Sequence, residues 1–248
     1  MIVRPIKVSV ITVCFNGEQM LAQTIESVLN QTYENIEYII IDGCSTDKSV
    51  EIARSYEERF NKKGYQYRVI SEPDNGIYDA MNKGIHIASG ELIGLINSGD
   101  WYELNAVQRM IDTYVEKPFD LFYADIRIWK QGGAIVKRAR LRNYATTRDW
   151  NHPTTFIKTE LYDQYQYACR GIYDDWDLIL KIRNAGSHIE ILNEVLANFT
   201  FGGISNRKSL KMAWTRGKER YRIYRENGYG WWYIAECILM ETAKYLMA

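Results

Sequence analysis

The first hundred residues alternate short apolar runs with stretches in which apolar residues recur every three or four positions. The runs cover residues 8–13, 38–41, 67–70 and 92–96. The first of them is rich in β-branched residues, which is typical of a strand that is buried on both faces, and the other three are also predicted to be strands. The stretches between them predict amphipathic helices, the second of which is expected to carry Ile52, Tyr56 and Phe60 in one piece. This order predicts an α/β fold with a Rossmann-like, mostly parallel sheet flanked by helices.

The pattern is weaker in the second half of the chain. It predicts a strand at 120–129 and a helix at 174–182, with less regular segments around them. Towards the end, one helix is expected at 206–227 and a second, largely apolar one begins at Trp231. The chain is therefore expected to end in two C-terminal amphipathic helices.

Polar residues follow each of the four predicted strands of the first half. Phe15 and Asn16 follow the first strand, Asp42 the second, residues 72–75 the third and residues 97–100 the fourth. In open parallel sheets, ligands bind beyond the carboxyl ends of the strands. We therefore expect these residues to form the site.

The charge of the chain changes this picture, because it is unevenly distributed. The 248 residues include 31 basic and 31 acidic ones, so the formal net charge is zero. However, residues 126–148 hold seven bases and no acid, and residues 205–225 hold eight bases and one acid. Each segment is thus +7, and the rest of the chain is acidic. A neutral total argues against a general nucleic-acid binder, but it leaves room for local contact with an anionic membrane.

The cysteine pattern and the hydropathy of the chain indicate its cellular compartment. The four cysteines and three histidines show no spacing typical of a zinc site or a disulfide framework, which favours a reducing, cytoplasmic compartment. The first apolar run stops at Asn16 without a small-residue cleavage site, so a strand is predicted there and no signal peptide. No run of 18 apolar residues is free of charge, so no membrane span is predicted.

A nucleotide-dependent oxidoreductase is one hypothesis for a chain that opens with a strand, a turn and a helix. A dinucleotide-binding turn needs several glycines that let the backbone approach the pyrophosphate. The turn after the first strand has Gly17 alone. The oxidoreductase therefore stays only as an alternative.

Four segments together carry a more specific signal. They are VSVITVCFNGE, QTYENIEYIIIDGCSTD, SEPDNGIYDAMNKGIHIASGELIGLINSGDW and YDDWDLILKI. In this order the chain resembles the inverting family 2 glycosyltransferases of the GT-A fold, especially the bacterial enzymes that build surface polysaccharide such as O-antigen or capsule. The resemblance covers about residues 6–200. It implies transfer of a sugar from a nucleotide-sugar donor, here a UDP-sugar, to a hydroxyl of a lipid-linked or growing polysaccharide acceptor.

The resemblance implies where the nucleotide lies. Val13, Cys14, Phe15 and Asn16 occupy the stretch whose backbone lies beside the base in the family. Asp42 stands where an aspartate accepts the N3–H of uracil, and an ionised carboxylate is suited to this because it only accepts. The alternative for Asp42 is that it caps a strand end or a helix.

The next segment departs from the family in its contact with the phosphates. Met81 stands where the family has an arginine, so another cation must face the diphosphate. Lys83 is one candidate, and Arg207 or Lys208 of the tail is another. Asp79 is expected to hydrogen-bond the ribose, unless it is a solvated helical acid.

The family's DXD motif is also altered. Its two acids, which bind a divalent cation on the diphosphate, are replaced by Asn97 and Gly99. Asp100 is therefore the expected ligand of Mg²⁺ or Mn²⁺, and Asn97 and Ser98 are expected to contact the donor. The loss of both acids raises the alternative of a catalytically impaired nucleotide-sugar-binding protein.

The acidic pair of the last segment implies the catalytic base. Asp175 matches the family's carboxylate that takes the proton from the acceptor hydroxyl. Adjacent helical residues diverge by about 100°, so Asp174 cannot face the same atom and is assigned to the acceptor instead. Trp176, His152 and Trp150 are also assigned to the acceptor. The alternatives are acids favoured by a helix N-terminus, a structural histidine and tryptophans that fill the core.

The domain organisation follows from these assignments. Residues 1–204 are expected to form the GT-A catalytic domain, with a nucleotide-binding half at about 1–100 and an acceptor-binding half at about 101–204. Residues 205–248 form the tail. Its first helix is expected to carry an apolar stripe of Leu210, Trp214, Tyr221 and Tyr224 beside a basic one of Lys211, Lys218, Arg222 and Arg225.

Such a tail suits the anionic inner face of the cell membrane, where a peripheral protein meets a lipid-linked acceptor. The alternatives are that both helices pack on the catalytic domain or form a homodimer contact.

Overall fold

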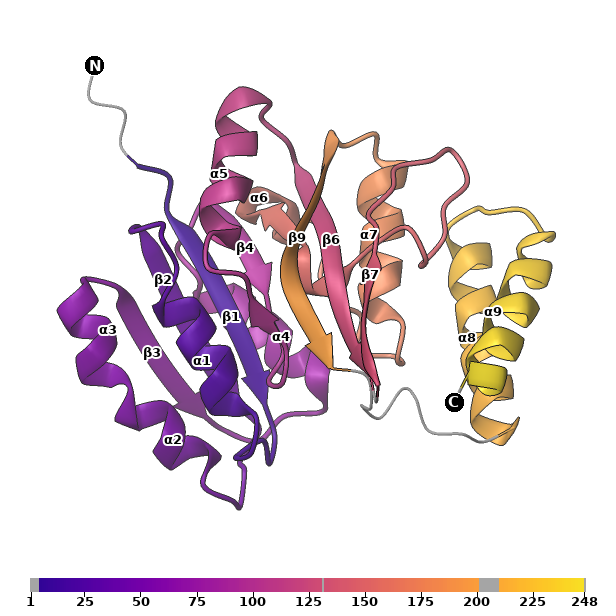
Figure 1. Cartoon of the computed structure of the whole chain (residues 1–248). Helices are drawn as coiled ribbons and strands as arrows, with labels where there is room; N and C mark the ends of the chain where they lie inside the picture. The colour runs from indigo at the N-terminus through magenta and orange to yellow at the C-terminus, as the bar shows by residue number, and fades with distance from the viewer. Residues whose placement is uncertain (1–4, 131, 201–209, 248) are drawn as a thin grey trace.

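The computed structural model describes residues 5–130, 132–200 and 210–247, and within them one mixed sheet forms the centre of the molecule (Figure 1). The strand order is β3-β2-β1-β4-β8-β6-β9-β5, and β7 pairs with β6 off this path. The strands are β1 (Val8–Cys14), β2 (Ile36–Asp42), β3 (Gln66–Ser71), β4 (Leu92–Leu95), β5 (Trp101–Tyr102), β6 (Leu121–Lys130), β7 (Gly133–Lys137), β8 (Phe156–Lys158) and β9 (Ile189–Thr200). The helices are α1 (Leu21–Leu29), α2 (Ser49–Ser55), α3 (Glu57–Lys63), α4 (Ile77–Ile87), α5 (Ala106–Glu116), α6 (Thr159–Tyr162), α7 (Asp174–Asn184), α8 (Leu210–Glu226) and α9 (Tyr233–Met247), with a short 3₁₀ turn at His152–Thr154.

The first four predicted strands form the parallel half of the sheet, as expected. β1 lies between β2 and β4 and pairs in parallel with both. Its last residue, Cys14, is in register with Asp42, the last residue of β2. The carboxyl ends of these strands therefore meet at one edge.

Helices cover both faces of the sheet, which confirms the second part of the prediction. Along β1, Val8 and Val10 belong to one core cluster, whereas Ile11 and Val13 belong to another. The first cluster includes residues of α1, α3 and α5, and the second includes residues of α4, α7, α8 and α9. The alternation of side chains along a strand thus divides the apolar residues between two layers.

One predicted helix is divided in two. The helix expected to carry Ile52, Tyr56 and Phe60 breaks at Tyr56, which caps the end of α2 and the start of α3. The break lets Phe60 stack on Tyr67 of β3, with ring centroids 4.3 Å apart. Packing against β3 therefore outweighs the continuity of the helical pattern.

The second half holds more regular structure than the pattern predicted. β9 pairs in parallel with β6, and the ladder is irregular around Ala124 and Asp125. Asn193 of β9 donates to the Asp125 carboxylate at 3.0 Å. Polar residues inside β9 thus find partners within the sheet, which is why the strand lacks a clear apolar alternation.

The two tail helices lie side by side at one end of the molecule, beyond α7 (Figure 1). Asn227 donates to Asp177 of α7 at 2.7 Å, and Tyr224 packs edge-on against Trp176. One face of the tail is therefore packed on the catalytic body. Within residues 5–130, 132–200 and 210–247, no helix has both the length and the apolar character that a membrane crossing requires.

Candidate active site

Several residues predicted to bind the nucleotide meet at the carboxyl edge of the parallel strands. The Ser98 amide donates to the Val13 carbonyl at 3.3 Å, so the loop after β4 lies against the end of β1. Cys14 lies beside Asp42. The structure thus brings together Val13, Cys14, Asp42 and Ser98 from three strand ends.

The loops after β1 and β2 are bonded to each other. Asn16 adopts a left-handed conformation with φ of 49°, and its side-chain oxygen accepts the Thr46 amide at 2.9 Å. The Asn16 amide donates to the Ser45 hydroxyl at 2.8 Å. These bonds fix the position of Phe15, whose ring is exposed to solvent. A fixed loop with an exposed aromatic ring suits contact with a planar ligand.

Asp42 is buried, and both of its carboxylate oxygens have partners within the chain. They accept the Ser45 amide at 3.0 Å, the Ser71 hydroxyl at 2.7 Å and the Ser45 hydroxyl. Asp42 therefore holds the turn after β2, which matches the capping alternative. Its contact with a uracil ring stays a prediction.

The candidate cation for the phosphates, Lys83, already has acidic partners in this structure. Its ammonium group lies 3.1 Å from Glu72 and 3.6 Å from Asp79, and it donates to the Pro73 carbonyl at 2.6 Å. The hydrogen bond that Lys83 donates to Glu72 raises the pKa of Lys83. Lys83 thus ties α4 to the loop after β3, and its phosphate contact stays a prediction. The tail candidates Arg207 and Lys208 lie outside the described residues.

The loop that replaces the DXD motif offers two oxygen donors. The side-chain oxygen of Asn97 is buried and has no hydrogen-bond partner among the described residues. Burial raises the pKa of Asp100 to about 7. Thr24 of α1 fixes the loop by accepting the Gly99 amide at 3.0 Å and donating to the Asp100 carbonyl at 2.7 Å.

These donors fit a hard cation of the Mg²⁺ type, which is held by one or two carboxylates together with phosphates and water. A complete protein cage is absent from the described part of the chain, where no three His, Cys, Asp or Glu side chains gather around a common point.

The acidic pair opens α7, and its two members differ in environment. The Asp174 carboxylate accepts the amides of Arg170 and Gly171 at 2.5 and 3.2 Å, so it holds the preceding loop. Asp175 points elsewhere, as the angle between adjacent helical residues requires. Its carboxylate accepts the Trp176 amide at 2.7 Å, and His152 and Tyr78 act on it electrostatically or through hydrogen bonding. Asp174 therefore has a structural role in this conformation, and its acceptor contact stays a prediction.

Burial raises the pKa of Asp175, while His152, the Trp176 amide and the Tyr78 hydroxyl each oppose that shift. Burial also lowers the pKa of His152, and Asp175 opposes that shift. A carboxylate with a raised pKa is a stronger base than a free aspartate. The environment of Asp175 thus suits general-base chemistry.

Two lysines near Asp175 escaped the sequence analysis. Burial lowers the pKa of Lys137 to about 8 and that of Lys244 to about 8, and Asp175 opposes both shifts. Lys137 comes from the end of β7 and Lys244 from α9. Tyr78 was also missed, although it directly precedes Asp79 in the segment that carries the resemblance.

The tryptophans assigned to the acceptor are buried. Trp150 and Trp176 lie 5.6 Å apart between ring centroids, and Trp150 also meets His152 at 5.8 Å. Both belong to the core cluster on the α7 side of the sheet. In this structure Trp150 packs against His152, and Trp176 directly follows Asp175 in the core. Their contact with an acceptor stays a prediction.

The tail reaches the acidic pair through a buried charge cluster. Glu241 of α9 accepts from Arg216 at 2.7 Å and from Arg220 at 3.0 Å. Arg220 and Glu241 also hydrogen-bond the Tyr173 hydroxyl, at 2.6 and 3.2 Å. Because Tyr173 immediately precedes α7, this cluster fixes the helix end that carries Asp175.

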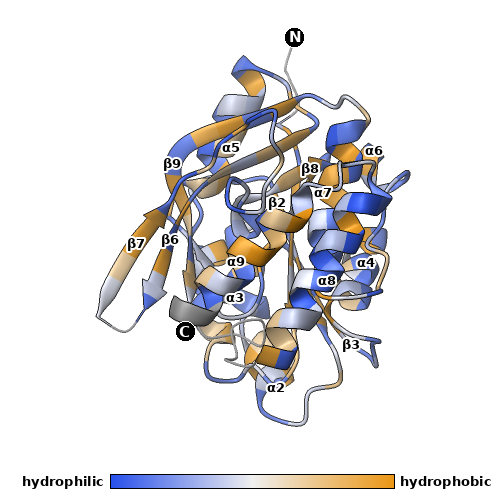
Figure 2. Ribbon diagram, turned by 90° about the vertical axis from the view of Figure 1, so that its right-hand side faces the viewer, coloured by the Kyte–Doolittle hydropathy of each residue, from blue (hydrophilic) through white to orange (hydrophobic). Residues whose placement is uncertain are grey.

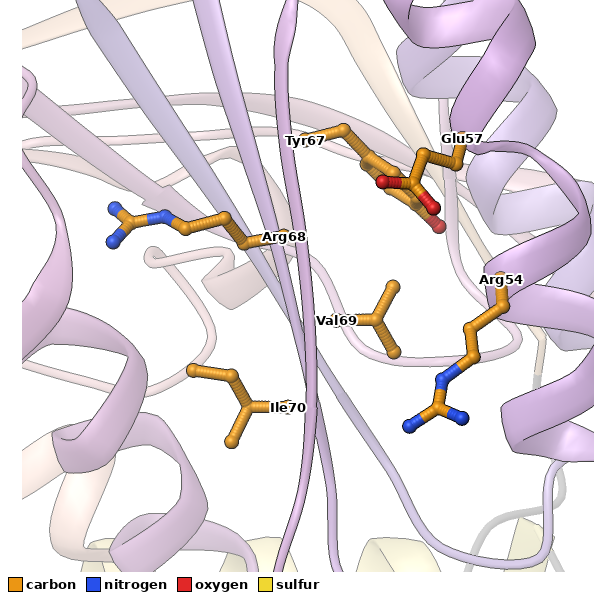
Figure 3. A pocket seen from close by; sticks show the side chains of 6 residues that line it. All are labelled: Arg54, Glu57, Tyr67, Arg68, Val69 and Ile70. Carbon is orange, nitrogen blue, oxygen red and sulfur yellow. The ribbon is translucent and has the colours of Figure 1, made fainter.

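A cavity of about 360 Å³ lies elsewhere, along the edge strand β3 (Figure 3). It is lined by Arg54, Glu57, Tyr67, Arg68, Val69 and Ile70. None of these residues belongs to the candidate site.

The curled, mostly parallel sheet with helices on both faces is a fold of the GT-A type. The sequence model of "Glycosyl transferase family 2" matches residues 9–173, which is about two thirds of the chain. The chain belongs to this family and is a glycosyltransferase.

Curated relatives agree with this assignment. The PGL/p-HBAD biosynthesis glycosyltransferase of Mycobacterium tuberculosis is 27% identical over 209 residues, which cover 80% of this chain and 78% of that protein. EpsH of Bacillus subtilis is 37% identical over 106 residues, which cover 43% of this chain and 30% of that protein. The match thus spans less than a third of EpsH.

Solved structures share the fold. TarS 1-349 of S. aureus, solved in complex with UDP-GlcNAc, has a TM-score of 0.67 at 16% identity, covering 97% of this chain and 73% of that chain. The mannosyltransferase PcManGT of Pyrobaculum calidifontis, solved with GDP-Man and Mn²⁺, has a TM-score of 0.70 at 14% identity. The coverage is 99% of this chain and 71% of that chain. At these identities the likeness concerns the fold alone.

Proposed function

We propose that this enzyme transfers one sugar from a UDP-sugar, with inversion, to a hydroxyl of a lipid-linked or growing polysaccharide. The observation that carries the proposal is the environment of Asp175. A carboxylate with a raised pKa opens α7 beside His152 and Tyr78, and Tyr78 lies on α4, directly after the donor-side loop. This arrangement supports a proposed base that lies next to the proposed nucleotide site.

In this proposal Asp175 takes the proton from the acceptor hydroxyl as that oxygen attacks the anomeric carbon. Attack from the face opposite the diphosphate inverts the configuration in a single displacement. His152 interacts electrostatically with this carboxylate, and the Tyr78 hydroxyl, which donates to the Ile172 carbonyl at 3.0 Å, also acts on it. A general base of this kind contributes about 10²- to 10⁴-fold to the rate.

The donor is proposed to lie on the carboxyl edge of β1, β2 and β4. Phe15, exposed at the tip of its loop, would contact the base, and the buried Asn97 oxygen would contact the donor or its cation. The names of two structural neighbours, which were solved with UDP-GlcNAc and GDP-Man, support a nucleotide-sugar donor. UDP is proposed over GDP because Asp42 ends β2, where its carboxylate would accept the N3–H of uracil.

Asp100 and Asn97 would hold a divalent cation, Mg²⁺ or Mn²⁺. When bound, this cation would supply positive charge to the diphosphate leaving group. The Asp100 carboxylate is buried, and its raised pKa shows that a nearby positive charge would stabilise its ionised form. A mannosyltransferase of the same fold was solved with Mn²⁺, which supports the choice of ion.

The reaction is proposed to occur in the cytoplasm, at the inner face of the cell membrane. All four cysteines are free thiols in the structure, and Cys44 and Cys169 are exposed. Exposed free thiols are typical of a reducing compartment. The name of the mycobacterial relative, a PGL/p-HBAD biosynthesis glycosyltransferase, supports an acceptor with a lipid portion.

A donor panel tests the proposal. The protein is incubated with UDP-, GDP- and dTDP-sugars, with Mn²⁺ or with EDTA, and with a short polyprenyl-diphosphate saccharide as acceptor. Release of UDP and a product whose anomeric configuration is opposite to that of the donor, assigned by NMR couplings, are expected. Release of another nucleotide refutes the UDP assignment, and retention of configuration refutes the single displacement.

The second candidate is a nucleotide-sugar-binding protein without turnover. It is favoured by Asn97 and Gly99, which replace both acids of the DXD motif. The same panel separates the two, because a protein of this kind would bind a UDP-sugar tightly and release no UDP.

A further inference from the structure

The outer face of α9 is apolar and exposed. Ile238 and Leu239 are 62% and 59% exposed, and Ile234 lies on the same face one turn earlier. Trp231 and Trp232 precede the helix and are also exposed. Figure 2 looks onto this end of the molecule and shows α9 as mostly hydrophobic beside the mostly hydrophilic α8. Monomeric soluble proteins rarely leave such a contiguous apolar face uncovered.

Basic residues flank this face on the α8 side. Lys211, Lys218, Arg222 and Arg225 are all exposed. Trp214 projects among them and is 77% exposed. Arg222 lies 3.6 Å from Glu226, an exposed acid that it shares with Arg170. The bases outnumber the acids on this side of the face.

The other basic segment of the sequence meets α9 from the opposite side. Tyr144 stacks on Tyr233 at the start of α9 with ring centroids 4.6 Å apart, and the Ala145 amide donates to the Tyr233 hydroxyl. Arg148 bonds the buried Glu236 at 3.1 Å. Arg138, Arg140 and Arg142 of this segment are exposed. Two parts of the chain that contact α9, namely α8 and residues 138–148, thus both carry exposed bases.

We propose that this face, formed by α9 with Trp231 and Trp232 and rimmed by the bases of α8 and of residues 138–148, docks on an anionic lipid bilayer. Aromatic residues favour the headgroup level, aliphatic ones the acyl boundary, and each basic residue gains from anionic lipid. A second copy of the chain is a poorer occupant. In a two-fold contact the face would meet itself, and the basic rims would repel each other.

The inner face of α9 points towards the proposed base, Asp175. Lys244 and Glu241 point inwards, and Lys244 interacts electrostatically with Asp175. The proposed base and the docking face therefore lie on opposite sides of α9, a helix that is roughly 10 Å across. This step rests on the proposed function, and it implies an acceptor whose reactive hydroxyl lies close to the headgroups. A short lipid-linked saccharide meets that condition, whereas the far end of a long chain does not.

Vesicle co-sedimentation tests the docking without any activity readout. The full chain is mixed with vesicles of phosphatidylcholine alone or with one quarter phosphatidylglycerol, at low and high salt. We expect at least tenfold stronger partitioning onto the anionic vesicles, weakened by salt. Equal binding to both vesicles, or binding to neither, overturns the proposal.

Paired variants keep the test specific. Ile238→Glu with Leu239→Glu is expected to reduce binding more than tenfold, whereas Val115→Glu, at an exposed apolar site on α5, leaves it unchanged. Lys218→Gln with Arg222→Gln is expected to reduce anionic binding about fivefold for each base removed. Lys62→Gln on α3 is the matched charge control. Unchanged UDP binding in thermal shift confirms that each variant is folded.

Two further outcomes are informative. A dimer in sedimentation velocity that the Ile238→Glu and Leu239→Glu pair abolishes, together with no vesicle binding, assigns the face to a second copy and overturns the proposal. If the unaltered protein binds anionic vesicles but transfers no sugar in the donor panel, the proposed function alone is refuted. For the acceptor, we expect faster transfer to a lipid-linked disaccharide than to a lipid-linked long chain. The reverse order would contradict an acceptor hydroxyl close to the headgroups.

Discussion

Glu241→Gln should detach the tail from the catalytic body, because within residues 5–130, 132–200 and 210–247 Glu241 is the only carboxylate that bonds Arg216 and Arg220. The side chains of Arg216, Arg220 and Glu241 are 4%, 1% and 7% exposed, so the cluster is shielded from water. The glutamine keeps the shape and one acceptor but removes the negative charge. Two guanidinium groups then share no counter-charge.

Removal of one partner from a buried ion pair costs about 3–5 kcal/mol. That is a large share of the roughly 5–15 kcal/mol by which a domain is stable. At about 2–4 °C per kcal/mol for a chain of this size, the melting temperature should fall by about 6–20 °C. The matched control is Glu226→Gln, whose partners Arg170 and Arg222 are more than two fifths exposed, and which should change stability by about 0–1 kcal/mol.

Urea unfolding and amide hydrogen exchange measure the effect. Exchange should rise first in α8 and α9 and at Tyr173, because Glu241 links these elements. Equal stabilities of the Glu241→Gln and Glu226→Gln proteins, within about 1 kcal/mol, would refute the reasoning. So would a destabilisation that left exchange in the tail unchanged.

Three further predictions follow from single groups. Because burial raises the pKa of Asp175, kcat/KM should fall as the pH drops through a value above the ordinary aspartate pKa of about 3.9; a pH profile of Asp175→Asn that kept this acid limb would contradict the assignment. Asp100→Asn should remove the dependence of UDP affinity on Mn²⁺, as measured by calorimetry, and an unchanged Mn²⁺ dependence would show that the ion is held elsewhere. Gly94→Ala should destabilise the protein by about 1–3 kcal/mol in urea, because a Cβ there would lie 2.3 Å from Phe156 in the core, and an unaltered midpoint would mean that the ring moves freely.

The parallel half of the fold could be predicted because β1, β2 and β4 each contain a continuous apolar run, although β3 is interrupted by Arg68 and lies partly exposed at the edge of the sheet. Ile11 and Ile39 lie on runs that are buried on both faces, so their pattern needs no knowledge of the partner strand. α5 was missed although Val107, Met110 and Ile111 do recur at helical spacing. β9 could not have been found in this way, because Asn193 and Asn198 lie within it and satisfy their side chains through Asp125, Arg127 and Trp129.

The residues of the candidate site also differ in whether a local sequence pattern reveals them. Asp42 and Asp175 could be singled out because local motifs surround them. Lys137 and Lys244 could not, since they come from β7 and α9 and reach Asp175 only through the folded chain. Their lowered pKa values arise from burial, which a sequence pattern does not reveal.

The most direct test of the central claim is the rate of sugar transfer by Asp175→Asn in a single turnover, with UDP affinity measured on the same preparation. If Asp175 is the base, the rate falls at least about a hundredfold while UDP affinity is unchanged. A rate within a few fold of the unaltered enzyme would contradict the assignment of Asp175 and with it the proposed mechanism.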